Sequence, residues 1–331
     1  MRRRWTAIPG ALAAVALTLA ACVTSQVRLP PTPLAAGPAI AIQASPVALD
    51  PADPARTAVG DFTFAGGVAL TSDQTSRLHG LSDLTVDADG DLLSVSDDGD
   101  LLAARLMLDA AGRLIGLTGG VIRPLTGLLG EPLQGKDWGD AEGVARLAGG
   151  ELLVSFERNH RIWLYPAGRD GRPEAVAAPR IAMSENDGME GLAAAPAQGR
   201  DAYWVGVEPG SLWLCRLKAA CAEVTGLPTP PVAYRLSGLT TGPNGELVVL
   251  HHSYVPAIGS RLIVTIVRDP TRTKEIVGSF ALTPPLAVDN FEGAAVVARP
   301  DGRWRLYLLS DDNFSATQRT LLLAFDWTPP R

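Results

Sequence analysis

The residues of this 331-residue chain that could do chemistry are acids at two places in a repeated pattern. Glu142, Glu190 and Glu292 each stand directly before a glycine that opens an apolar run. Acids also follow the next apolar run, as Asp97, Asp98, Glu157, Glu208, Asp311 and Asp312. The start of the first strand and the end of the second lie at the same end of a hairpin. Repeated hairpins would therefore gather these acids at one rim.

Clustered carboxylates of this kind favour a hard cation, because Ca²⁺ takes roughly six to eight oxygen ligands. We assign the three glutamates as candidate catalytic residues, and the acids after the second runs as candidate ligands of calcium. The alternative is local turn chemistry, in which Asp and Asn side chains bond nearby backbone amides.

Basic side chains near these motifs are candidates for substrate binding, namely Arg158, His160, Arg161, His252 and Arg319. They could bind a substrate anion beside the cation or pair with neighbouring acids, and the sequence leaves both open. His251 and His252 lie where other repeats carry acids. Without cysteine partners or an H-E-x-x-H context they favour exposed rim histidines over a zinc site.

Five repeats carry these residues, opening at Gly80, Gly143, Gly191, Gly238 and Gly293 with spacings of 63, 48, 47 and 55 residues. A turn glycine follows each opening, and then a strand-like run at 91–96, 151–156, 202–207, 246–250 and 304–309. A third apolar run completes each repeat.

Short antiparallel sheets repeated at this period bury their faces by radial stacking, which predicts an all-β fold, a β-propeller of four-stranded blades. Residues 61–70 form an extra strand before the first repeat, and they are expected to complete the last blade and close the ring. We predict five blades; the 63-residue spacing leaves a sixth, degenerate blade as the alternative.

The last repeat also carries a family resemblance. Residues 289–294, 309–315 and 318–322 resemble the closing signature of the phytase-like domain family, labelled esterase-like activity of phytase. Shorter matches support the likeness over roughly 61–327, at 81–84, 95–99, 142–143, 155–162 and 188–192. The resemblance implies an exported propeller in which acids hold calcium and calcium binds phosphate. Residues 250–254 depart from the family, which commonly has an acidic-basic pair there.

The N-terminal segment indicates export. Three arginines precede an apolar run that is too short to span a bilayer comfortably, and Cys22 follows a small-residue boundary similar to a bacterial lipoprotein box. We predict a signal peptide over 1–21 and lipidation of Cys22, with anchoring at the outer membrane favoured over the inner one. A flexible tether is expected over 22–60, and the propeller domain over 61–331.

Net charge and missing motifs argue against two classes of function. The net charge of −6 becomes −9 without residues 1–21, so nucleic-acid binding is disfavoured. No G-x-S-x-G motif is present, which argues against a serine esterase of the α/β-hydrolase type. We predict a monomeric, calcium-assisted hydrolase of phosphate or other esters. The alternative is a non-catalytic propeller that binds a ligand or an envelope partner.

The two remaining cysteines, Cys215 and Cys221, are expected to form a disulfide. Export places them in an oxidising compartment, and the five residues between them can fold back as a hairpin. Facing positions of such a hairpin lie within the range that a disulfide tolerates.

Overall fold

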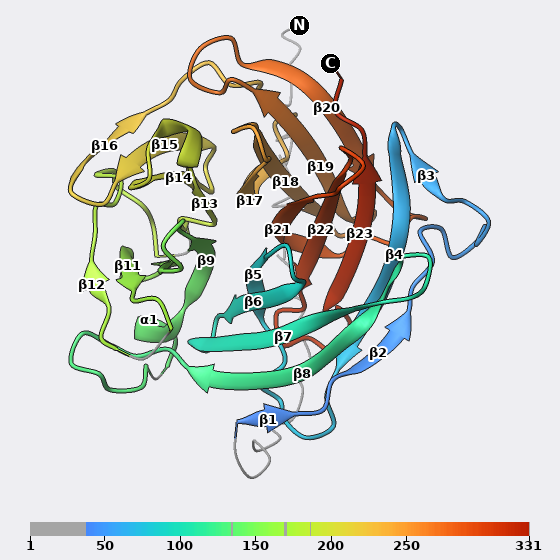
Figure 1. The fold of residues 1–331 in the computed structure, drawn as a ribbon, viewed down its shortest axis with the longest axis horizontal. Coiled ribbons are helices and arrows are strands. Elements are labelled where there is room, and N and C mark those ends of the chain that lie inside the picture. The colour runs from blue at the N-terminus through green and yellow to red at the C-terminus, as the bar shows by residue number, and fades with distance from the viewer. Residues whose placement is uncertain (1–37, 134, 169–170, 186, 331) are drawn as a thin grey trace, which may run out of the picture.

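The fold consists almost entirely of short antiparallel sheets around a common centre (Figure 1). The structure, a computed structural model, describes residues 38–133, 135–168, 171–185 and 187–330. Within these ranges the helices are one turn, α1 (Lys136–Gly139), and a 3₁₀ turn, η1 (Pro196–Gln198). None of the helices described here is long and apolar enough to cross a membrane.

The sheets are five blades, numbered in chain order. Blade 1 contains β5 (Leu81–Val86), β6 (Asp91–Ser96), β7 (Asp100–Leu108) and β8 (Leu114–Pro124). Blade 2 contains β9 (Ala141–Arg146), β10 (Leu152–Phe156), β11 (Arg161–Tyr165) and β12 (Glu174–Ala175). Blade 3 contains β13 (Gly191–Ala194), β14 (Ala202–Val207), β15 (Ser211–Arg216) and β16 (Ala219–Glu223). Blade 4 contains β17 (Arg235–Thr241), β18 (Leu247–Val255), β19 (Gly259–Arg268) and β20 (Glu275–Leu282).

Blade 5 closes the ring with strands from both ends of the described chain. It contains β21 (Asn290–Ala298), β22 (Trp304–Asp311) and β23 (Leu321–Trp327), and β4 (Phe62–Thr71) pairs with β23. The five-bladed propeller closed by an early strand is therefore confirmed. The described part of the long first interval holds β8, a loop and α1 in place of a sixth blade.

The expected flexible tether is wrong for much of its described part, because three short strands within residues 38–60 pair with the propeller, while residues 51–57 are exposed. The strand β1 (Ala39–Ile40) pairs with β8, while β2 (Gln43–Pro46) and β3 (Ala58–Val59) pair with β4. Leu49 is only 1% exposed within the core between blades 4 and 5. Proline and alanine content concealed this packing, since short edge strands need no clear period.

The core is divided into five apolar clusters, each between two neighbouring blades. The cluster between blades 4 and 5 includes a group of aromatic rings, in which Phe62 stacks on Trp327 with centroids 5.5 Å apart. The apolar faces of each sheet are thus buried only by the adjacent sheets, so every blade depends on two neighbours.

The innermost strands β5, β9, β13, β17 and β21 contact one another around the centre (Figure 1). Glycines permit this approach: a Cβ on Gly238 would lie 1.8 Å from the carbonyl oxygen of Glu292. In blade 1 the same position holds Asp83 rather than Gly80, the residue that the sequence analysis aligned there. The carboxylate of Asp83 accepts bonds from the amides of Val144 in blade 2, at 2.8 Å, and Ala294 in blade 5, at 3.4 Å. Asp83 therefore links three blades.

The predicted disulfide between Cys215 and Cys221 is present, with Cα atoms 4.1 Å apart. It joins β15 to β16 beside an irregularity in their pairing. The bridge fastens the outer hairpin of blade 3 and lies away from the centre of the ring.

Candidate functional site

A bulge repeated in the blades aims the first set of site residues. The pairing of first and second strands shifts by one residue in blades 1, 2, 4 and 5, and the extra residues are Ser82, Glu142, Ser237 and Glu292. Glu190 holds the same place in blade 3, directly before β13. A bulge turns a side chain out of the alternating pattern of the strand. The Glu-Gly pairs seen in the sequence are therefore this bulge and the close-approach glycine after it.

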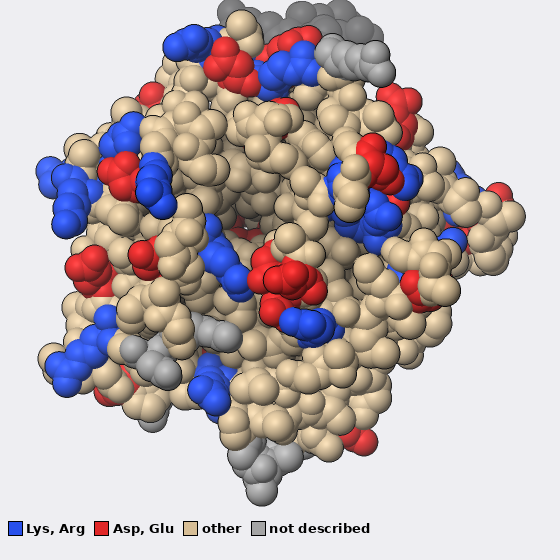
Figure 2. Space-filling model, viewed as in Figure 1, with Lys and Arg blue, Asp and Glu red and all other residues tan. Residues whose placement is uncertain are grey.

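The ends of the second strands supply the other set, one residue from each blade. These residues are Asp97, Glu157, Glu208, His252 and Asp311. They line one cavity of about 420 Å³ together with Glu142, Glu190, Ser237 and Glu292. Figure 2 shows the molecule hollowed near its centre, with acidic side chains beside the hollow. The structure thus brings together seven of the predicted acids, which we call the acidic wall: Asp97, Glu142, Glu157, Glu190, Glu208, Glu292 and Asp311.

Burial and mutual repulsion raise the pKa values of the carboxylates in the acidic wall. Burial is the main cause that raises the pKa of Glu142, Glu190 and Glu292 well above the ordinary value, and neighbouring carboxylates add to it. The pKa of Asp311 is also raised well above its usual range by burial and by Asp97. Glu157 is less buried, and burial together with Asp140 raises its pKa to about 7. Both causes disfavour the charged carboxylate, so a cation would bind in competition with protons.

Among the residues that the structure describes, only two cationic side chains line the cavity, and both are already paired. The ammonium of Lys136 lies 2.9 Å from Asp97 Oδ2 and 3.2 Å from Asp140 Oδ1. Although burial opposes it, the attraction of these acids raises the pKa of Lys136. The guanidinium of Arg235 lies 3.0 Å from Asp187 and 3.4 Å from Glu208. Arg158 attracts Glu157 from outside the cavity, and among the described residues no cation forms an ion pair with Glu142, Glu190, Glu292 or Asp311.

The donor atoms fit a hard divalent cation. Carboxylate oxygens of Asp97, Asp140 and Glu142 lie within 4.8 Å of one another. Asn290 and Asn313 add amide oxygens to the lining, and cysteine is absent from it. Calcium prefers such an all-oxygen set, whereas zinc favours nitrogen and sulfur.

Other predicted site residues lie outside the cavity. Asp98 is exposed, and Asp312 accepts hydrogen bonds from the Gly80 amide at 3.0 Å and Thr320 Oγ1 at 2.7 Å. Asp312 also lies 2.5 Å from His79 Nδ1. The structure therefore gives Asp312 a structural role and leaves Asp98 away from the acidic wall.

Most of the predicted substrate-binding residues also have structural partners. Arg158 pairs with Asp140 at 2.8 Å, and Arg319 pairs with Asp289 at 3.3 Å. His160 lies 3.0 Å from the carbonyl oxygen of Ser184. Arg161 stacks on the Phe156 ring at 3.9 Å, and burial lowers its pKa to about 10. None of these four lines the cavity.

The two histidines of blade 4 are not the exposed pair that the sequence suggested. His251 is 8% exposed, and burial lowers its pKa to about 4. His252 lines the cavity, and burial together with Arg261 lowers its pKa to about 4 as well. Both rings are therefore neutral at pH 7.

Sequence reasoning missed several cavity residues for two different reasons. Ser237 was visible as the serine that replaces glutamate before the fourth repeat glycine, but it carries no charge to mark it. Lys136 lines the cavity and its partner Asp140 lies behind it, and both belong to the connection between blades 1 and 2, where no repeat signal exists. Tyr254 has no counterpart in the other blades that would draw attention to it.

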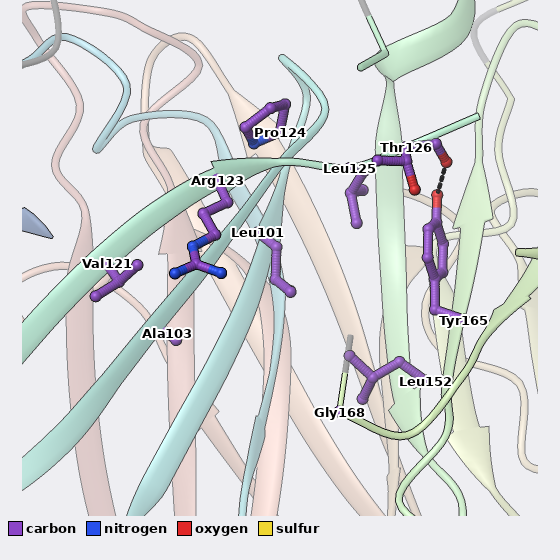
Figure 3. Close-up of a pocket in the computed structure, with 10 residues that line it drawn as sticks. All are labelled: Leu101, Ala103, Val121, Arg123, Pro124, Leu125, Thr126, Leu152, Tyr165 and Gly168. Atoms are coloured by element: carbon purple, nitrogen blue, oxygen red, sulfur yellow. Dashed lines mark hydrogen bonds between the residues drawn. The ribbon is translucent and has the colours of Figure 1, made fainter. Parts of the chain in front are cut away.

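A second cavity, of about 280 Å³, lies between blades 1 and 2 (Figure 3). Its lining is mostly apolar, and the Tyr165 hydroxyl donates to the Thr126 carbonyl oxygen at 2.9 Å. Arg123 is the only charged residue among the ten that line it. Without a carboxylate this cavity offers neither a general base nor ligands for a hard cation.

The chain is similar to several known proteins in structure and to one family model in sequence. No curated protein matches the chain in sequence. The major allergen Mala s 1 of Malassezia sympodialis is similar in structure at 14% identity, over 82% of this chain and 91% of that one, with a TM-score of 0.45. Regucalcin of Agrobacterium tumefaciens, a calcium-binding protein, is similar at 12% identity over 90% of each chain, with a TM-score of 0.46. A family model described as "Phytase-like: Esterase-like activity of phytase" matches residues 76–314.

Proposed function

Because the chain belongs to the phytase-like family, we propose that its axial cavity hydrolyses phosphate esters or other esters with the help of a bound divalent cation, calcium in the first place. The observation that carries this proposal is the acidic wall. Seven carboxylates share one cavity with only two cationic side chains, both already paired. Such a charge imbalance is favourable only when protons or a cation balance it.

Asp97, Asp140 and Glu142 are the residues that would hold the cation. A bound divalent ion neutralises anionic oxygens and lowers the pKa of bound water. Lys136 lies among the same carboxylates, so it contributes a positive charge that is already in place. Glu190 and Glu292 extend the negative charge across the cavity.

Glu157 is the best candidate for the general base. Its pKa of about 7 matches the pH at which it would accept a proton from water. The sequence analysis assigned Glu157 to the metal and the buried glutamates to catalysis. Burial favours the reverse, because it raises the pKa of Glu142, Glu190 and Glu292 well above the ordinary value and so disfavours their charged, proton-accepting form.

The test compares hydrolysis of 4-nitrophenyl phosphate and 4-nitrophenyl acetate in calcium and in chelator. We expect activity that requires calcium and falls about 100-fold in Glu157→Gln, within the usual range for a general base. Glu275→Gln is the matched control, since its carboxyl is 57% exposed in blade 4. Calcium binding without turnover of any ester would favour the ligand-binding alternative. Turnover that is unaffected by chelator would contradict the role of the cation.

We also propose that the chain is exported and anchored through a lipid on Cys22, which lies outside the described residues. The positive n-region, the apolar run and the small-residue boundary support this proposal. Cys22→Ser should release the protein from membranes into the periplasmic fraction. Unchanged membrane retention with an unlipidated N-terminus by mass spectrometry would contradict it.

A further inference from the structure

One side of the axial cavity differs in chemistry from the rest. Blade 4 contributes no carboxylate to the lining, in contrast to the other four blades. Its contribution, which we call the blade-4 wall, consists of uncharged residues: Ala233, Leu236, Ser237, His252, Ser253 and Tyr254. The one charged lining residue of this blade, Arg235, is held by Asp187 and Glu208. The cavity therefore has a charged side and a neutral side.

Tyr254 presents an unusual surface for a cavity residue. It is 60% exposed although it lines the cavity, so a large part of its ring is open to solvent. Leu236, in the same wall, is 3% exposed and forms an apolar backing. An accessible aromatic ring at a cavity offers stacking and apolar contact to a flat ligand group.

His252 adds a polar atom that lacks a partner. Its Nε2 is buried and makes no hydrogen bond within the described residues. A buried polar atom in this condition costs free energy unless a ligand or water satisfies it. The neutral ring has one donor and one acceptor nitrogen, so Nε2 can form one hydrogen bond with a hydroxyl or an ester oxygen of a ligand.

The acidic wall restricts the same ligand from the other side. Each anionic group of a ligand must be balanced by a cation in this cavity, and Lys136 and Arg235 are already engaged. A ligand with one anionic group and one uncharged organic group suits both sides: a bound cation balances the anionic group at the acidic wall, and the organic group contacts the blade-4 wall. A ligand with many anionic groups would face carboxylates without enough counterions.

We propose that the blade-4 wall binds the organic group of the ester, and that it selects an uncharged aromatic or apolar alcohol, with Tyr254 as the main determinant of specificity. This inference rests on the proposed function, because it takes the other end of the ligand to be the anionic group at the acidic wall. His252 Nε2 then faces the ester oxygen or a hydroxyl of the organic group.

The experiment measures binding of two phosphonates, which cannot be hydrolysed, by calorimetry in the presence of calcium. Phenylphosphonate carries an aromatic group and methylphosphonate does not, while their anionic ends are alike. We expect the phenyl compound to bind about tenfold more tightly, from ring stacking and apolar burial. Tyr254→Ala should abolish this difference and leave methylphosphonate binding unchanged. Ile258→Ala is the matched control, since Ile258 is 53% exposed at the turn of the same hairpin and does not line the cavity.

The outcomes separate this inference from the proposed function. Equal affinities for the two phosphonates would overturn the inference and leave calcium-assisted phosphate binding standing. If neither phosphonate binds, the phosphate part of the proposed function fails, and phenol without calcium decides the inference by ligand-observed NMR. Phenol binding that is lost in Tyr254→Ala supports the blade-4 wall as an aromatic site, and absence of phenol binding overturns it.

Discussion

Blades 2 and 4 present nearly the same backbone to the cavity and opposite chemistry. In both, the first strand carries a bulge and the second strand reaches the rim, where β10 ends at Phe156 and β18 continues to Val255. Blade 2 places Glu142 and Glu157 at these two positions, whereas blade 4 places Ser237 and His252 there. The difference teaches that two positions in each blade set the polarity of the cavity, while the strands only aim them. The chemistry of the cavity therefore depends on which residues occupy these two positions in each blade, and not on the fold itself.

The largest effect is expected when blade 2 loses a carboxylate from the cavity. Glu142→Gln should remove most of the stabilisation that calcium gives, while the calcium-free protein keeps or gains stability because a buried repulsion disappears. At calcium about 100-fold above its Kd, we expect the wild-type Tm to rise by roughly 5–10 °C. Thermal melts in calcium and in chelator measure both effects. The exposed Glu275→Gln variant should respond as the wild type does, and an equal calcium response in Glu142→Gln would refute the prediction.

The reverse change gives blade 4 the chemistry of blade 2. His252→Glu adds a carboxylate to the cavity at the place that Glu157 holds in blade 2. We expect calcium affinity to rise about threefold to tenfold, and phenylphosphonate to lose its advantage over methylphosphonate. Isothermal titration of all three ligands measures these changes. Unaltered calcium affinity would mean that the blade-4 position does not contribute to the field of the cavity.

A change of pH should alter the stability contributions of Glu157 in blade 2 and His252 in blade 4 in opposite directions. The folded pKa of Glu157, about 7, lies above its unfolded value, so its contribution to stability is lost as pH rises toward 7. The folded pKa of His252, about 4, lies below its unfolded value near 6.5, so its contribution is lost as pH falls from 6.5 toward 4. In calcium-free melts between pH 4 and 7.5, Glu157→Gln should remove a falling component of stability and His252→Gln a rising one. Slopes that change in the same direction would show that one of these assignments is mistaken.

The repeat made most of this architecture predictable. Five blades, ring closure by an early strand and the Cys215–Cys221 bridge all follow from spacing and hairpin geometry, which are local properties of the chain. The acidic wall was predictable for the same reason, because Glu142, Glu190 and Glu292 recur at one place in the repeat. Lys136 and its partner Asp140 were not, since they come from a connection with no period, and Lys136 reaches the cavity only through tertiary packing.

Burial was the other property that the repeat could not supply. The sequence predicted two exposed histidines at the rim, whereas only His252 lines the axial cavity, and burial lowers the pKa of both rings. Asp98 and Asp312 each follow a cavity residue by one position and lie past the end of the strand, where Asp98 is exposed and Asp312 bonds to Thr320. A pair of adjacent acids therefore contributes one member to the cavity, and the sequence does not say which.

The smallest effect belongs to blade 3 and serves as a reference for the other variants. Replacing Cys215 and Cys221 together with serine should lower stability by less than about 3 kcal/mol, because the bridge closes a short loop. Calcium response and phosphonate binding should stay as in the wild type, since neither cysteine lines the cavity. Denaturant unfolding and calorimetry check this. Collapse of the fold in the double variant would show that the hairpin holds more than its own blade.

The segment before β3 crosses from one side of the ring seam to the other, and this decides how the molecule would carry a pulling force. Ala39 and Ile40 pair with β8 of blade 1, and Gln43 to Pro46 then pair with β4, which closes blade 5. Tension applied at residue 38 is borne first by the two pairs of β1, and only after they part by the longer pairing of β2. The ring itself stays closed by β4 and β23 while these outer contacts yield in turn. A pull on the N-terminal side would thus separate β1 from blade 1 before it separates β2 from blade 5.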